Sequence, residues 1–242
     1  MKKIATSLGW LMLLIPFFTM AGTRTIYPVI KHTPSDSETR QVSGFHGIAS
    51  GGSFNVTVNI GSQESLKIEG DSEVLAKIET VVEKGILVIR TKRGMNWGWN
   101  TGKVNVYVTA RSLSTLTCSG SGSITVEDRL KSAELNTVVS GSGSIRLSAD
   151  TKDYNAVISG SGSISIAGSA TDASILVSGS GGFRGSDFST SSTSVKVSGS
   201  GSVHVAAEKT LDAKLSGSGS VRYSGNAQVS MVKSGSGSVK KI

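Results

Sequence analysis

The chain has 242 residues, a formal net charge of +8 and an aromatic content of 5%, which leaves few large side chains for a core. The basic excess is mild for this length; it is compatible with anionic sugars but does not predict nucleic-acid binding. The single cysteine, Cys118, excludes a disulfide within one chain and is interpreted as a small buried apolar residue.

Residues 1–21 combine a basic start, a short apolar run and small residues before a cleavage point, which is typical of a secretory signal peptide. The apolar run is too short to span a bilayer, and no later segment is predicted to cross one. We therefore expect an exported protein in the periplasm, on the outer-membrane surface or outside the cell. Residues 22–41 lack a clear pattern and are predicted to be a linker.

Residues 42–117 alternate in the manner of strands but show no clean repeat. Within them, 71–78 is predicted to be a short helix with Asp71 or Ser72 as its cap, and 80–90 a hairpin or a coil corner. We expect this irregular β section to cover the open end of the repeats that follow, because terminal coils must hide bare strand edges.

Residues 118–242 contain seven copies of a six-residue phrase, Ser-Gly-Ser-Gly-Ser followed by an apolar residue. The copies begin at Ser119, Ser140, Ser159, Ser178, Ser198, Ser216 and Ser234, and the copy at Ser178 is relaxed to Ser-Gly-Ser-Gly-Gly-Phe. Their starts lie 18–21 residues apart. Such a period in a β-rich chain is typical of a solenoid with one coil per repeat.

Alternation of apolar and polar residues runs through each phrase in constant phase, so apolar residues share one face and serines the other. The glycines share the apolar phase and are interpreted as inner positions of a tight bend without room for a Cβ. The predicted inward rows are Cys118, Val139, Ile158, Val177, Val197 and Leu215 before the phrase, and Ile124, Ile145, Ile164, Phe183, Val203 and Val221 after it. We predict an all-β, single-stranded, right-handed parallel β-helix; a flexible Gly/Ser linker is the alternative that this phase disfavours.

Several segments resemble a known family: residues 44–48, 54–58, 66–70, 85–89 and 104–109, together with the Ser-Gly-Ser-Gly-Ser repeats. From about residue 42 to 242 the chain resembles the putative auto-transporter adhesin, head GIN domain family, which is common in exported proteins of Bacteroidetes. The resemblance implies a parallel β-helix similar to the pectin-lyase architecture but without its catalytic residues. It also implies a role in cell adhesion, and it supplies no catalytic residues to transfer.

The sequence shows no catalytic or metal-binding constellation. His32, His46 and His204 lack the Cys, His or carboxylate neighbours of a metal or nucleophile site. The aspartates fall in the predicted irregular bends, where turn chemistry is favoured over a calcium site. We predict no enzyme, no metal and no cofactor; the alternative is a polysaccharide-active, lyase-like enzyme on the same fold.

Three surface features are candidates for binding. An outward row directly after the phrase would align a basic stripe suited to anionic glycans, unless it is only a solvated face: Arg146, Arg184, His204, Arg222 and Lys240. A second row would expose an apolar patch suited to a partner contact, unless residues 42–117 cover it: Val138, Val157 and Leu176. Trp97 and Trp99 lie in a polar loop and would either stack on sugar rings or plug an open end of the core.

These observations predict an exported, non-enzymatic, adhesin-like module that presents a repetitive β-helix surface to glycans or to envelope and surface proteins. A purely structural envelope protein is the remaining alternative. Self-association into a homo-oligomer is left open.

Overall fold

The computed structural model describes residues 36–92, 94 and 103–242, of which 76% are in strands and 2% in helix. The N-terminal elements are β1 (Asp36–Arg40), β2 (Gly47–Gly52), β3 (Asn55–Ile60), β4 (Ser65–Gly70), α1 (Ser72–Leu75), β5 (Ile78–Glu83), β6 (Ile86–Thr91), β7 (Asn105–Ala110) and β8 (Thr115–Gly120). The repeat elements are β9 (Ser123–Gly141), β10 (Ser144–Gly160), β11 (Ser163–Gly179), β12 (Gly182–Gly199), β13 (Ser202–Gly217), β14 (Ser220–Ser224), β15 (Gln228–Ser234) and β16 (Ser238–Lys241).

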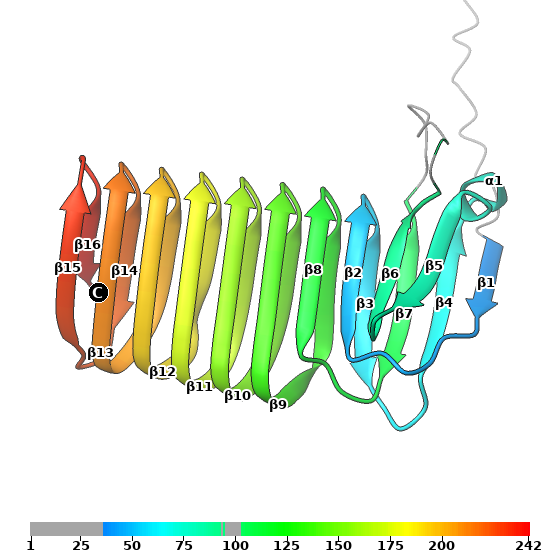
Figure 1. Ribbon diagram of the computed structural model, residues 1–242, viewed down its shortest axis with the longest axis horizontal. Helices are drawn as coiled ribbons and strands as arrows, with labels where there is room; N and C mark the ends of the chain where they lie inside the picture. Colours follow the sequence, from blue (N-terminus) through cyan, green and yellow to red (C-terminus); the bar gives the residue numbers. More distant parts are fainter. Residues whose placement is uncertain (1–35, 93, 95–102) are drawn as a thin grey trace, which may run out of the picture. The chain divides into compact units, whose positions relative to one another are not determined.

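Each strand from β9 to β13 forms one coil, running from one Ser-Gly-Ser-Gly corner to the next (Figure 1). It descends along one wall, bends, and returns along the other wall, so the coils pair in parallel with their neighbours. Wall A, which follows the corners, orders β1-β4-β7-β3 before the coils and ends in β14 and β16. Wall B, which precedes the corners, orders β5-β6-β2-β8 before the coils and ends in β15. The predicted all-β parallel β-helix is confirmed.

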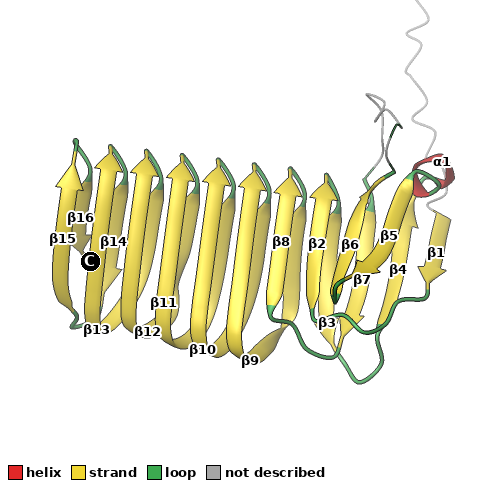
Figure 2. Ribbon diagram, in the orientation of Figure 1, coloured by secondary structure: helices red, strands yellow, loops and turns green. Residues whose placement is uncertain are grey.

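The bend opposite the corners absorbs the varying length of the repeats. The strands continue through it, but their pairing skips residues, for example between Arg146 and Ser148 on β10 and between Gly185 and Ser189 on β12. Figure 2 shows this bend as strand in the coils β9 to β13. The extra residues of longer repeats therefore form β-bulges that do not pair with the neighbouring coil, and the register of both walls is kept.

The two glycines of each corner have different environments, which corrects the prediction that both face inward. Gly143 is buried, and a Cβ there would lie 2.7 Å from the Cys118 sulfur. Gly141 is exposed with φ +107°, and a Cβ there would lie 2.7 Å from the carbonyl oxygen of Gly120 in the preceding coil. That oxygen accepts hydrogen bonds from Ser142 N and Gly143 N, each at 2.9 Å, so the glycines allow the close approach that satisfies these backbone groups.

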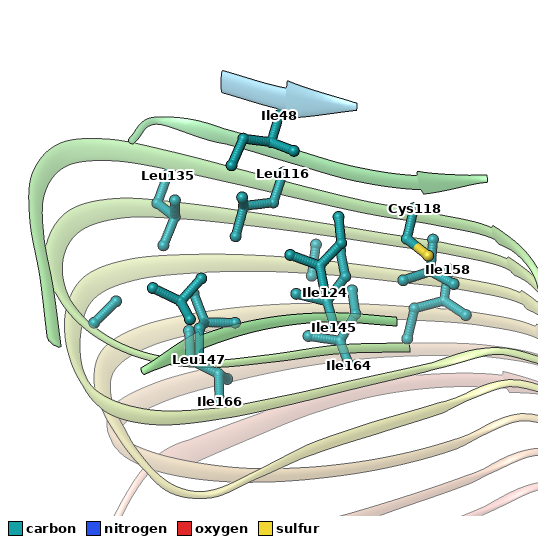
Figure 3. Close-up of a cluster of buried hydrophobic side chains, with 14 of the residues drawn as sticks. Ile48, Leu116, Cys118, Ile124, Leu135, Ile145, Leu147, Ile158, Ile164 and Ile166 are labelled. Carbon is teal, nitrogen blue, oxygen red and sulfur yellow. The ribbon is translucent and has the colours of Figure 1, made fainter. Parts of the chain in front are cut away.

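The core is a stack of aliphatic rows between the two walls. Figure 3 shows the labelled side chains of this cluster, Ile48, Leu116, Cys118, Ile124, Leu135, Ile145, Leu147, Ile158, Ile164 and Ile166, in the interior. Every residue of the two predicted inward rows is buried, including Cys118, whose pKa burial raises. Neighbouring rungs lie about 4.8 Å apart, which gives each side chain a similar one above and below.

The N-terminal section closes the first end of the solenoid with antiparallel strands. The short helix predicted over 71–78 is present as the shorter α1, because Ile78 already begins β5. Asp71 caps it, and its carboxylate accepts a hydrogen bond from Glu73 N at 2.9 Å. The predicted hairpin is β5–β6. Gly52 forms a further corner that the Ser-Gly-Ser-Gly phrase did not predict. Its carbonyl oxygen accepts hydrogen bonds from Ser121 N and Gly122 N, as the corner glycines of the repeats do from the next coil.

The structure describes little of the two segments predicted before residue 42. The predicted signal peptide, residues 1–21, lies outside the described residues. Of the predicted linker, 22–41, the last part forms β1, which pairs antiparallel with β4. Backbone pairing with an open edge orders this strand, and its side chains carry no alternating pattern that could have predicted it.

Candidate functional site: a basic ladder on wall A

The predicted basic stripe forms one continuous ladder on wall A. We call it the basic ladder: Arg146, Ser165, Arg184, His204, Arg222 and Lys240, each paired in register with the next. Because parallel strands are about 4.8 Å apart, the last four of these residues place a basic side chain on every rung. Phase within the repeats was enough to predict this alignment, because all six positions follow directly after the corner.

A groove of about 460 Å³ lies along this ladder. Its lining residues are Arg146, Leu147, Ser148, Ser165, Ile166, Ala167, Arg184, Ser186, Asp187 and His204. Asp187 is the single carboxylate among them. The groove is therefore lined by basic groups, hydroxyls and a few aliphatic atoms, which suits a polar ligand that carries negative charge.

The charges of the ladder are not neutralised by ion pairs within the part of the chain that the structure describes. Among the described residues, no ion pair involves Arg146, Arg184, Arg222 or Lys240. His204, which is half-buried between Arg184 and Arg222, has a pKa lowered first by burial and then by these two guanidinium groups. The lowered pKa reflects, in part, the positive potential of the ladder.

We expect His204 to titrate below the ordinary histidine value of about 6.5 in an NMR pH titration of the free protein. Arg222→Ala should move its pKa back toward that value, because one source of repulsion is lost, whereas Lys209→Ala on the bend should leave it unchanged. The unfolded chain binds this proton more readily than the folded chain. The stability that depends on neutral His204 is therefore present above about pH 6.5 and is lost as the pH falls from there through the lower pKa of the folded state. Titration at or above 6.5 would contradict the assignment.

Wall B carries a second, acidic row that the sequence interpretation missed. Glu134, Asp153 and Asp172 pair in register on successive coils and line a groove of about 850 Å³. The prediction had placed Asp153 and Asp172 in an irregular bend. Counting six residues back from each phrase would have aligned the row, since Glu134, Asp153 and Asp172 keep the phase of the corners.

The predicted apolar row is longer than expected, and the described residues of the N-terminal section do not cover it. Val138, Val157 and Leu176 are half-buried and pair in register along wall B. The row continues through Thr117, Ala49, Val88 and Val81, so residues of the N-terminal section extend it instead of packing over it. Its use as a partner contact stays a prediction.

The remaining candidate residues are two tryptophans and the aspartates of the bends. Trp97 and Trp99 lie outside the described residues. Asp150 accepts hydrogen bonds from Arg129 and Ser169, and these donors lower its pKa. Asp128 accepts from Ile60 N at 2.7 Å. These two aspartates therefore serve contacts between coils, as turn chemistry implies, and the described part of the chain holds no group of three or more candidate metal ligands.

The fold and its corners define a class, the parallel β-solenoids with Ser-Gly-Ser-Gly turns. A family profile described as "putative auto-transporter adhesin, head GIN domain" matches residues 44–227. Because the match covers most of the chain, this protein belongs to that family, as its resemblance predicted. No match was found among the curated proteins.

Solved structures share the fold. A putative adhesin from Bacteroides fragilis superposes with a TM-score of 0.80 at 21% identity, over 86% of this chain and 97% of that one. A putative lipid binding protein from Parabacteroides distasonis gives 0.71 at 22% identity, over 87% and 98%. A putative adhesin from Parabacteroides merdae gives 0.70 at 20%, over 87% and 97%. At these identities the likeness shows the fold alone. None of the described helices has the length and apolar character needed to cross a bilayer.

Proposed function

We propose that this chain is an exported, non-enzymatic adhesin-like module whose basic ladder binds an anionic glycan at a cell surface or in the envelope. Family membership supports adhesion as the general role. The observation that carries the glycan proposal is the run of Arg184, His204, Arg222 and Lys240 on consecutive rungs, without an ion-pair partner among the described residues.

The regular spacing favours an extended ligand over a compact one. A small anion would engage one or two guanidinium groups, whereas a linear chain with repeated carboxylates, sulfates or phosphates would engage several rungs at once. Hydroxyls of Ser165 and Ser186 line the same groove and are able to hydrogen-bond sugar oxygens. The ladder is therefore suited to a charged polysaccharide.

The larger groove on wall B is a poorer site for such a ligand. Its carboxylates Glu134, Asp153 and Asp172 would repel a polyanion, although the groove has almost twice the volume of the one on wall A. Charge, and not volume, therefore favours the groove on wall A for a polyanion, because contacts between like charges oppose binding even in a larger groove.

The proposal is tested by immobilising the mature protein and measuring binding of a polyuronide and of lipopolysaccharide. Exposed charge contacts are worth about 0.2–1 kcal/mol each, so the Arg146→Ala/Arg184→Ala/Arg222→Ala variant should bind about tenfold more weakly. Binding should also weaken with salt, since the contacts lie at the surface. The two ligands distinguish a polymer with carboxylates from the phosphates of a lipid headgroup region.

A matched control carries the same change in charge away from the ladder: Lys152→Ala/Lys196→Ala/Lys209→Ala. This variant should keep nearly full affinity. Equal loss in both triple variants would mean that net charge, and not the ladder, governs binding. Unchanged binding in the arginine variant would remove the ladder as the site.

A further inference from the structure

His204 is the member of the basic ladder whose charge changes near neutral pH. It lies on β13 and is paired in register with Arg184 of β12 on one side and with Arg222 of β14 on the other. Parallel strands are about 4.8 Å apart, so both guanidinium groups come from adjoining rungs. Arginines stay charged in proteins, whereas a histidine gains its proton between about pH 8 and pH 5. His204 therefore decides whether every rung from Arg184 to Lys240 carries a positive charge.

The charged groups that face His204 are mainly of its own sign. Arg184 faces it from β12 and Arg222 from β14, and Asp187 of β12 is the one carboxylate among the residues that line the same groove. The next charged residues of β13 itself lie on the bend. No ion pair within the described residues involves His204. Burial and the two guanidinium groups lower the pKa of His204, so Asp187 does not offset them.

A bound polyanion would reverse this balance. Its negative groups would lie beside Arg184 and Arg222 and would offset their repulsion of an imidazolium, and they would also attract the imidazolium directly. An opposite charge nearby favours the charged form of a titrating group. By thermodynamic linkage, a ligand that favours the bound proton is itself bound more tightly when that proton is present, and by the same factor.

We propose that His204 takes up a proton when a polyanion binds to the basic ladder, so that the ladder holds an anionic glycan more tightly in mildly acidic surroundings. Such coupling rests on the proposed function, since it needs a polyanion on the ladder. The pKa of His204 is then higher in the complex than in the free protein, where it is lowered. The gain in affinity is therefore absent well above the pKa of the complex, grows as the pH falls through that value, and is complete below the pKa of the free protein.

The experiment is isothermal titration calorimetry of the mature chain with two probes, dextran sulfate and a polyuronide. Sulfates and uronate carboxylates both stay charged at about pH 5, because a carboxyl group titrates near about 3.3–3.9. One exposed charge contact is worth about two- to fivefold in affinity, so both probes should bind tighter by that factor at about pH 5 than at about pH 8. Near the midpoint, the heat of binding should depend on the buffer, because protons are taken up.

Three variants assign this response to one side chain. His204→Gln cannot be protonated, so it should bind at low pH only as tightly as the unchanged chain binds at high pH. His204→Arg carries a permanent charge and should bind at both pH values as the unchanged chain binds at low pH. The matched control is His46→Gln, because His46 is exposed and lies outside the basic ladder; this variant should keep the full response. Circular dichroism checks that each variant is folded.

An NMR titration gives a second readout on the unchanged chain. Dextran sulfate should raise the pKa of His204 by about 0.3–0.7 pH unit, which is the same two- to fivefold factor seen from the side of the proton. Polyanion binding that is independent of pH, a response equal in His204→Gln, or a response with one probe only would overturn the coupling and leave the basic ladder as a glycan site. Absence of binding to both probes would overturn the proposed function as well.

Discussion

Alanine in place of Gly179 is expected to lower the free energy of unfolding by about 3 kcal/mol or more. Gly179 has φ +112°, a conformation that costs about 1–3 kcal/mol for a residue with a side chain. Its Cβ would also lie 2.6 Å from the carbonyl oxygen of Gly160 in the preceding coil. Moving two backbones apart adds about 1–3 kcal/mol of overpacking, so the two costs act together.

The same corner offers a matched control at Gly182, where the relaxed phrase has glycine in place of serine. Gly182 has no positive φ, and a Cβ there would meet nothing closer than the Ser202 hydroxyl at 3.4 Å. Gly182→Ala should be neutral or stabilise by up to about 1 kcal/mol, because it restricts the unfolded chain. Urea denaturation followed by circular dichroism measures both variants. Similar losses in the two would show that the corner does not depend on the stacking of backbones.

The second large effect on the free energy of unfolding is expected at Phe183, which stands in an inward row that holds isoleucine or valine in the other coils. Gly185, two positions on, is buried, and a Cβ there would lie 2.6 Å from the Phe183 ring. In the next coil the same two positions hold Val203 and Val205. The ring thus fills the space that a side chain at 185 would otherwise occupy. Gly185→Val alone should cost about 1–3 kcal/mol by overpacking.

A double-mutant cycle tests this coupling. Phe183→Ile alone should also destabilise, because it leaves a cavity in the row. The combined variant Phe183→Ile/Gly185→Val restores the pattern of neighbouring coils and should recover about 1–3 kcal/mol relative to the sum of the single changes. Ile145→Val with Val205→Ala, three coils apart, should be additive. Additive losses for Phe183 and Gly185 would contradict the shared space. Denaturant titration of all four chains gives the cycle.

Counting residues from each corner correctly predicted the rows next to the corners. The same counting was not extended to residues further from a corner, and their alignment was missed. The inward rows and the basic ladder lie within a few residues of the phrase, so repeat phase alone aligned them. Glu134, Asp153 and Asp172 lie six residues before the next phrase, in unbroken register with it, but Asp153 and Asp172 were assigned to the irregular bend because no apolar alternation marks where the bend ends. Gly141 was placed inward because alternation has only two faces, whereas its Cβ would point along the stack.

The sequence by itself determined which side chains face the interior. The repeated corner fixes the wall on which a residue lies, and the alternation with a period of two fixes whether its side chain points inward or outward. Only the tertiary structure decided which residues become neighbours across coils far from the corners, because bulges change the count between rungs without changing the phase. The tertiary structure also decided how the ends differ. Pairing of β1 with β4 and the hydrogen bonds of Arg40 cover one end, while Val229 and Met231 are exposed at the other.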